Sequence, residues 1–233
     1  IIRSLKEGLI ANKISKIYGI FNGTSNYILS SMDKQNKNFK EVLADAQNFG
    51  YAETNPSADL NGDDVSSKLK ILSSLCFNSF LNDNIYVEGI KNIDKTDIDN
   101  ANKLGYKIKL LGFAESINNK IYQRVHPTLI KKNSYVASID GVLNAVIVDG
   151  KPVGQSIIQG EGAGAAATTS ALISDISSIL RGNIKFPFSL SSKERKKLNF
   201  GNINDRYFSA YLRFEVEDKS GVLSNITNIF SKN

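Results

Sequence analysis

Apolar residues along most of the chain follow helical or strand-like patterns, and the two kinds of pattern succeed one another. Helical spacing predicts helices at residues 1–11, 24–33, 38–49, around Lys68, and at 95–106, 165–180 and 220–230. Strand-like runs occupy residues 16–23, 107–117, 120–130, 144–150, 154–160 and 211–217. This mixture of strands and helices predicts an α/β fold.

Turn and cap residues mark several boundaries between these elements. Asn118 and Asn119 separate two strand-like runs and predict a β-hairpin. Thr24 or Ser25 is expected to cap the helix over 24–33, and Gly50 to end the helix over 38–49. The 211–217 run alternates strictly, so its apolar residues (Leu212, Phe214, Val216) are expected to face inward and its charged residues (Arg213, Glu215, Glu217) outward.

The helix around Lys68 is expected to carry an unusual lysine. With Val65 as the origin and about 100° per residue, one apolar stripe falls within roughly 40° and a second at roughly −80 to −120°. The first stripe holds Leu69, Leu72 and Cys76, the second holds Ile71 and Leu75, and the opposite, solvent-facing side holds Ser66, Ser67, Lys70, Ser73 and Ser74. Lys68 falls between the two apolar stripes, and Asp64 precedes it by one turn. On helix geometry alone, Lys68 and Asp64 are either a structural ion pair or working groups, with the structural reading slightly ahead.

The loop before this helix shifts the interpretation of Lys68 and Asp64 toward working groups. The stretch GYAETNPSADLNGDDVSSKLKIL (residues 50–72) adds three more carboxylates: Glu53, Asp59 and Asp63. Bringing these acids together is costly unless a cation lies among them. Asp59, Asn61 and Asp63 have calcium-loop spacing, but the loop opens directly into a helix and no Glu stands at the twelfth position, which argues against calcium.

Composition and charge limit the class of protein. The 233 residues are 41% hydrophobic, which is enough for one large domain or for one domain with a small second one. No apolar run approaches the length of a membrane span, and the single cysteine excludes a disulfide framework and fits a reducing compartment. The net charge of +6 does not indicate nucleic-acid binding, because the lysines are spread along the chain. The one dense cluster, SSKERKK (residues 191–197), is expected to be part of a solvated linker.

A glycine-rich turn is the second stretch of chemical interest. Gly160, Gly162 and Gly164 precede the helix over 165–180, and such a turn lets backbone approach a ligand and presents amide groups to an anion. The stretch is a poor dinucleotide fingerprint, since it reads G-x-G-x-x-A and lacks an acidic residue about 20 positions on. A tight turn that packs a helix on a sheet explains it equally well. The lone His126 is interpreted as structural.

Four stretches, in this order and spacing, resemble the catalytic and dimerisation domain of the homoserine dehydrogenase family. They are GIFNGTSNYIL, GYAETNPSADLNGDDVSSKLKIL, RVHPTLI and GEGAGAAATTSALISDI. The resemblance covers residues 1–182 and implies a mixed sheet covered by helices. Residues 183–206 are expected to be a linker, and residues 207–233 resemble the first strand and helix of an ACT regulatory domain, with Ser220-Gly221 in place of the usual Pro-Gly.

The resemblance also implies an activity and a set of site residues. Homoserine dehydrogenase reduces L-aspartate 4-semialdehyde to L-homoserine with NADPH or NADH, in the biosynthesis of threonine, methionine and isoleucine. By resemblance Lys68 is the proton donor, and Asp64 and Glu53 take the ammonium group of the substrate. Two further positions are carried over around the substrate: Asp59, and Thr24 of the strand end Asn22-Gly23-Thr24. The positions carried over near the cofactor are Gly50, Glu53, Gly162 and Gly164.

The same resemblance implies what surrounds this chain. The nucleotide-binding half, a further lysine and a sodium-binding loop are expected upstream. The protein is expected to be a cytoplasmic homodimer or higher oligomer, with a small-molecule substrate and no nucleic acid or membrane. The alternative function is an amino-acid-sensing and dimerisation fragment without independent catalysis. A dimerisation half with degenerate chemistry is disfavoured, because Glu53, Asp64 and Lys68 are all retained.

Overall fold

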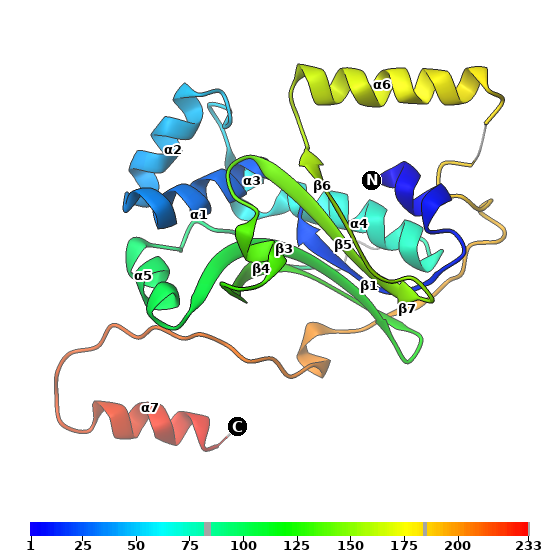
Figure 1. Ribbon diagram of the computed structural model, residues 1–233. Coiled ribbons are helices and arrows are strands. Elements are labelled where there is room, and N and C mark those ends of the chain that lie inside the picture. Colours follow the sequence, from blue (N-terminus) through cyan, green and yellow to red (C-terminus); the bar gives the residue numbers. More distant parts are fainter. Residues whose placement is uncertain (82–84, 184–185, 233) are drawn as a thin grey trace.

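A computed structural model describes residues 1–81, 85–183 and 186–232, and its strands form one mixed seven-stranded sheet (Figure 1). The strands are β1 (Lys13–Ile20), β2 (Tyr86–Val87), β3 (Tyr106–Ile117), β4 (Lys120–Lys131), β5 (Leu143–Lys151), β6 (Gly154–Glu161) and β7 (Asn199–Phe200). The order is β2-β4-β3-β1-β5-β6, with β7 also paired to β4. β2 and β7 run parallel to β4, and the other pairs are antiparallel. The predicted mixed sheet is confirmed.

The helices follow the predicted order. They are the π-helical turn η1 (Ser4–Gly8), α1 (Gly23–Gln35), α2 (Phe39–Asn48), α3 (Ser57–Asn61), α4 (Asp63–Phe77), α5 (Lys95–Lys103), α6 (Ala165–Leu180) and α7 (Val222–Phe230), with short 3₁₀ turns η2 (Tyr135–Ser138) and η3 (Ile203–Asp205). The short helix α3 lies inside the acidic loop and was not predicted, because five residues are too few for a periodic pattern.

Polar side chains set the ends of several elements. Asn118 and Asn119 both have positive φ, at 49° and 61°, which confirms the β3–β4 hairpin turn. The cap of α1 is Asn22, whose side chain accepts a hydrogen bond from the Ser25 amide, so the expected Thr24 or Ser25 cap is wrong. Gly50, at φ 74°, follows the end of α2 as predicted.

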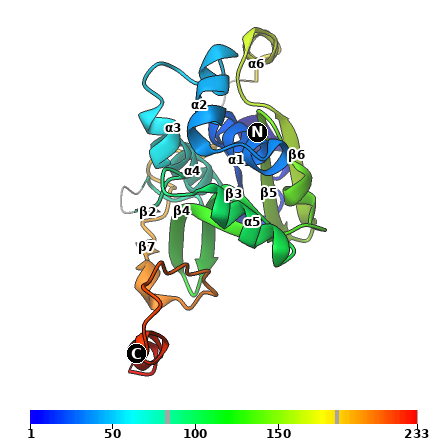
Figure 2. The same cartoon turned by 90° about the vertical axis from the view of Figure 1, so that its left-hand side faces the viewer.

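Helices cover one face of the sheet, and the main core lies beneath them (Figures 1 and 2). Alternate residues of β1, β3 and β5 point into this core, where α1, α4 and α5 meet them. Among its fully buried members are Ile17, Ile28, Leu29, Leu69, Leu110 and Val148. The intervening residues form a smaller apolar cluster on the other face, built around Ile20, Leu111, Phe113, Ala145 and Ile147 and packed against η2.

Helix α4 is buried over a different arc from the one predicted. Ser66, Ser73 and Ser74 were expected to face solvent and are buried, whereas Ile71 is exposed. Gln123 of β4 donates a hydrogen bond to the Ser73 hydroxyl, and Arg195 donates one to the Ser74 hydroxyl at 2.6 Å. The helix is therefore covered by β4 and by the segment around Arg195, which hydropathy alone does not reveal.

The expected linker is attached to the domain rather than fully solvated. Arg195 lies over the rings of Phe80 and Phe188, at 4.7 and 4.3 Å from their centroids. Its guanidinium also donates to the Ser79 carbonyl. The lysines of SSKERKK are exposed as predicted, but Arg195 is not. Residues 184 and 185 of this stretch, and the final residue 233 of the tail, lie outside the described residues.

The 211–217 run forms no strand in the described structure, so that prediction is wrong for this chain. Leu212, Phe214 and Val216 are all exposed instead of facing inward. A strand needs a hydrogen-bonding neighbour, and no described segment pairs with this one. Arg213 instead ties the segment to α5 through Asp97 and Asp94, at 2.8 and 2.7 Å.

Helices α6 and α7 stand away from the sheet, at opposite ends of the molecule (Figure 1). Neither contains a buried residue. α6 exposes several large apolar side chains: Leu172, Ile173, Ile176, Ile179 and Leu180. Within the described residues, no helix is long and apolar enough to cross a membrane.

A buried lysine ties α1 to the sheet and to the turn before β5. Lys109 of β3 is 1% exposed, and its Nζ donates to Asp140 Oδ1 (2.8 Å), the Ile139 carbonyl (2.7 Å) and Asn26 Oδ1 (2.9 Å). These bonds use all three ammonium hydrogens. Burial opposes the charge on Asp140, but hydrogen bonds from Lys109 and Lys34 outweigh it, so the pKa of Asp140 lies below its usual value. The stabilisation from the Asp140 charge is therefore present at neutral pH and is lost as pH falls through that lowered pKa.

We predict that Asp140→Asn destabilises the protein by about 3–5 kcal/mol, because Lys109 is left buried without its counter-charge. The matched control is Asp45→Asn, which breaks a Lys–Asp pair of similar length (Lys37 Nζ to Asp45 Oδ2, 2.7 Å) whose side chains are more exposed, at 42% and 32%. Urea unfolding of both variants should show a much larger loss for Asp140→Asn. Equal losses would contradict the role given to the buried pair.

Candidate active site

Three chain segments meet where β1 ends. Asn22 follows β1 and begins α1, Asp59 lies in α3, and Asp64 lies in the first turn of α4. Gly62 joins α3 to α4 at φ 88°, a conformation that favours glycine. A Cβ at Gly62 would lie 3.1 Å from Val87 and 3.2 Å from Val125, so the turn is also pressed against the sheet. The two aspartates are thereby brought to the N-terminus of α1.

Hydrogen bonds join these residues into one polar network. The Asn22 amide Nδ2 donates to Asp59 Oδ1 at 2.7 Å and to Asp64 Oδ2 at 2.8 Å. Lys68 Nζ donates to the same Asp64 Oδ2 at 2.8 Å and to the Phe21 carbonyl at 3.0 Å. The structure thus brings together three of the predicted site residues, Asp59, Asp64 and Lys68.

The network opens toward solvent on one side. Asn22 is 5% exposed, whereas the side chains of Asp64 and Lys68 are 29% and 46% exposed. Lys68 therefore lies at the rim of the α4 core face and not inside it, which corrects the inner-face prediction. Of the neighbouring apolar stripe, Leu75 is buried as predicted but Ile71 is exposed, and Lys68 therefore lies at the edge of the covered face of the helix.

The loop that carries Glu53 is held by α1 and α2. Thr24 Oγ1 donates to the Tyr51 carbonyl at 2.6 Å, and Gln47 Nε2 donates to the Glu53 carbonyl at 3.2 Å. The Glu53 side chain itself is exposed and makes no hydrogen bond or ion pair with any described residue. Asp63 is also exposed and does not join the Asn22 network. The structure thus fixes the backbone at Glu53 and leaves its carboxylate available.

The glycines expected near a cofactor occupy two separate turns. Gly50, at φ 74°, has open space where a side chain would begin. Gly162 and Gly164 lie between β6 and α6, with Gly164 at φ 97°. A Cβ at Gly162 would lie 1.9 Å from Asn144 Nδ2, so a larger residue here would have to displace the Asn144 side chain. No hydrogen bond in the described structure links this turn to Asn22, Asp64 or Lys68.

Other candidate groups are structural. His126 stacks on Phe113, with 5.7 Å between ring centroids, and burial lowers the pKa of its imidazole. Burial raises the pKa of the Cys76 thiol to about 12, which makes the thiol a poor nucleophile. The described residues contain no group of three or more His, Cys, Asp or Glu side chains that could hold a metal ion.

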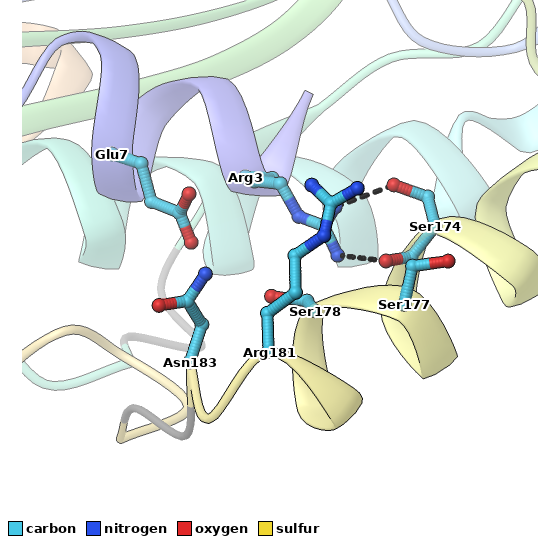
Figure 3. A pocket seen from close by; sticks show the side chains of 7 residues that line it. All are labelled: Arg3, Glu7, Ser174, Ser177, Ser178, Arg181 and Asn183. Carbon is cyan, nitrogen blue, oxygen red and sulfur yellow. Dashed lines mark hydrogen bonds between the residues drawn. The ribbon is translucent and has the colours of Figure 1, made fainter.

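A cavity elsewhere in the molecule has a different character. It has a volume of ≈ 350 Å³ and lies between the N-terminal turn and α6 (Figure 3). Arg3 and Arg181 point into it, and Arg3 also donates to the Ser174 carbonyl at 3.0 Å. None of its lining residues belongs to the Asn22 network, so this cavity is not the candidate site.

Sequence reasoning gave no separate role to Asn22 or Gln47. Asn22 entered only as part of the strand end Asn22-Gly23-Thr24, and Gln47 was not singled out within the helix predicted over residues 38–49. An Asn directly before a helix is a signal for an N-cap, and this signal could have identified Asn22 as the cap of α1. The two carboxylates to which Asn22 Nδ2 donates, on Asp59 and Asp64, are 37 and 42 residues away in sequence, and no local pattern reveals them.

Comparisons with known proteins give a consistent result. A sequence model described as homoserine dehydrogenase matches residues 1–177. The homoserine dehydrogenase of Helicobacter pylori is 43% identical over 234 residues, which covers 100% of this chain and 55% of that protein. A crystal structure of a homoserine dehydrogenase from Thiobacillus denitrificans matches with a TM-score of 0.84 and 36% identity, covering 99% of this chain and 55% of that one.

A more distant structure shares the fold. A hyperthermophilic archaeal homoserine dehydrogenase, determined in complex with NADPH, matches with a TM-score of 0.66 at 24% identity and covers 78% of this chain and 52% of that one. The chain described here spans only a little more than half the length of these relatives.

Proposed function

The chain belongs to the homoserine dehydrogenase family, and from that membership we propose that the whole protein reduces L-aspartate 4-semialdehyde to L-homoserine. The observation that carries the proposal is the shared contact at Asp64, where Asn22 and Lys68 both donate to Oδ2. This contact places a half-exposed ammonium beside the Asp64 carboxylate, which Asn22 links to the Asp59 carboxylate. The ammonium serves the proposed proton transfer, and the carboxylates serve the proposed binding of the substrate.

Lys68 is the proposed proton donor. Reduction of an aldehyde leaves negative charge on its oxygen, and a positioned ammonium stabilises that oxygen and then protonates it. The Lys68 ammonium is anchored by two acceptors, Asp64 Oδ2 and the Phe21 carbonyl. Since an ammonium has three hydrogens, one remains to donate to the substrate oxygen.

The carboxylates are the proposed binding site for the ammonium group of the substrate. Asp64 and Glu53 take this group, and Asp59 supports Asp64 through their shared bond to Asn22. The Glu53 carboxylate has no partner among the described residues, and its loop is fixed by Gln47 and Thr24. An amino-acid substrate thus supplies the cation that this cluster of acids calls for.

NADPH or NADH is the proposed reductant, and when bound it supplies the hydride. Two features of this chain fit the approach of such a cofactor. Gly50 and Gly164 have positive φ and no atoms where a side chain would begin, so ligand atoms can come close to the backbone there. Gly162, Gly164 and Glu53 are exposed and are the proposed cofactor contacts.

The rest of the whole protein is proposed to complete this site. The exposed apolar face of α6 is a surface that a further domain would cover. The nucleotide-binding half, the further lysine and a sodium-binding loop are proposed to lie in that remaining part, and the protein is proposed to work in the cytoplasm. Residues 1–182 are the proposed catalytic and dimerisation domain, and residues 183–206 the linker.

Residues 207–233 are proposed to begin an ACT regulatory domain. The exposed Leu212, Phe214 and Val216, together with apolar residues of α7, are what an incomplete domain leaves uncovered. Additional strands would pair with the 211–217 run and bury these side chains. A regulatory and dimerisation fragment without catalysis is the second candidate, and the network around Asp64 does not favour it.

We predict that Lys68→Met in the complete protein lowers kcat by about 10²–10⁴-fold, because the proton donor is removed while the apolar stem is kept. Thermal stability should change little, since the side chain is half-exposed.

Asp64→Asn should raise KM for the semialdehyde as well as lower kcat, because it removes charge that faces the substrate ammonium.

Lys40→Met is the matched control, because Lys40 is an exposed helical lysine on α2 outside the network. Steady-state kinetics and melting temperatures of the variants separate the two readings of Lys68. If Lys68 were only a structural partner of Asp64, both site variants would melt earlier and keep a kcat near wild type. A stable and fully active Lys68→Met enzyme would rule out the assigned proton donor.

A separate prediction concerns residues 1–233 produced alone. This fragment should show no dehydrogenase activity and weak NADPH binding, because the proposed nucleotide-binding half supplies most cofactor contacts. Assays of semialdehyde reduction and NADPH titration test this, with the complete protein as the positive control. Turnover by the fragment would show that the domain boundary is misplaced.

We further propose that the chain dimerises through its mixed sheet and not through the tail. The sheet face opposite the main core is covered by only short segments of the described chain, and Tyr135, Val153 and Ile157 around β5 and β6 are exposed. Deleting residues 205–233 should therefore leave a dimer in light scattering. A monomer after the deletion would contradict this interface.

A further inference from the structure

Asn22 makes three side-chain hydrogen bonds, and each one goes to a different element. Its Oδ1 accepts from the Ser25 amide at 2.8 Å and so caps α1. Its Nδ2 donates to Asp59 of α3 and to Asp64 of α4. A primary amide has two N–H donors, so both hydrogens of Asn22 are used on carboxylates. The residue is 5% exposed and lies on the protein side of the network.

We propose that Asn22 is a positioning residue that holds Asp59 and Asp64 side by side and aims them at the ammonium group of the substrate. This inference rests on the proposed function, and it adds a residue for which no contact with substrate is claimed. Asn22 acts through the carboxylates that it binds.

The chemistry of the position explains why an amide suits it. Two carboxylates that share one small group repel each other unless donors stand between them. A lysine at this position would neutralise the site and compete with the substrate ammonium, whereas an acid would add a third negative charge. The neutral amide supplies one donor to each carboxylate and leaves the negative charge of the pair in place.

The bond pattern also sets the direction in which the acids face. Asn22 occupies Asp59 Oδ1 and Asp64 Oδ2 from the buried side. In the part of the chain that the structure covers, the second oxygen of each carboxylate has no hydrogen-bond partner. Asp59 and Asp64 therefore each keep one oxygen for a cation that arrives from the open side of the network.

The cap bond makes this arrangement rigid. Because Oδ1 is fixed by the first turn of α1, the Nδ2 group cannot rotate away without losing the cap. The same first turn carries Thr24, which binds the carbonyl of Tyr51 in the Glu53 loop. The N-terminus of α1 thus sets the position of Asp59 and Asp64 and also supports the loop of Glu53.

The test compares Asn22→Ser with Asn38→Ser in the complete protein. Serine caps helices about as well as asparagine, so Asn22→Ser keeps a cap on α1 but removes the donors to Asp59 and Asp64. Asn38 caps α2 by accepting from the Glu41 amide, and it lies outside the network. Asn38→Ser therefore measures the effect of the cap change alone.

Binding is measured by calorimetry with L-homoserine and with 4-hydroxybutanoate, which is the same molecule without the ammonium group. Asn22→Ser should weaken L-homoserine binding by about 10- to 100-fold, the loss expected when hydrogen bonds to charged groups are removed. Its affinity for 4-hydroxybutanoate should equal that of wild type. Asn38→Ser should bind both ligands as wild type does.

The pH profile of kcat/KM gives a second readout, which a purely structural role would not move. In Asn22→Ser the acidic limb should shift to higher pH, because a carboxylate that loses a hydrogen-bond donor holds its proton to higher pH. Asn22→Asp keeps the size and the cap but adds a like charge, so it should shift the limb in the same direction. Asn22→Asp also serves as the test if Asn22→Ser does not fold.

The outcomes separate this inference from the proposed function. A wild-type protein that does not oxidise L-homoserine overturns the proposed function, and the inference with it. An active wild type with unchanged L-homoserine affinity and pH profile in the Asn22 variants overturns the inference alone. Equal loss of both ligands would also overturn it, since the effect would not involve the ammonium group.

Discussion

The carboxylate oxygen that Asn22 and Lys68 share on Asp64 is the contact on which the candidate site depends. Asn22 lies between β1 and α1, and Lys68 and Asp64 belong to α4, so this one oxygen ties the end of the central strand to the helix that carries the proposed chemistry. Asp59 joins through the second hydrogen of Asn22. Without this contact the acids would repel each other and the lysine would lose its fixed direction.

The surrounding fold serves this contact from the core side. α4 packs on β1 and β3 through Val65 and Leu69, both fully buried, and these residues directly follow Asp64 and Lys68 in the chain. Gly62 presses the α3–α4 turn against Val87 and Val125. Asn22 is therefore the outermost buried residue of this region, and the carboxylates of Asp59 and Asp64 and the ammonium of Lys68 remain accessible to a ligand. A rigid inner layer with an open outer layer is what a preorganised site requires.

Local patterns predicted much of this fold, and they failed where distant segments interact. The hairpin at Asn118–Asn119 and helix α6 were predicted, because their signals lie within the element itself. The burial of Ser73 and Ser74 depends on Gln123 and Arg195, which are far along the chain, and periodicity cannot show it. The 211–217 run has a strand pattern but no partner strand among the described residues. Its pattern describes a surface that other strands would have to complete.

Lys68 shows the same limit at the candidate site. Its pairing with Asp64 followed from the spacing of four residues, but its exposure depended on what else covers α4.

A structure of the complete protein with L-homoserine bound tests the account most directly. The ammonium group should lie within hydrogen-bond distance, about 2.7–3.2 Å, of Asp64 and Glu53, with the hydroxyl oxygen beside Lys68. A ligand bound in the reverse orientation, or away from the Asn22 network, would contradict the account.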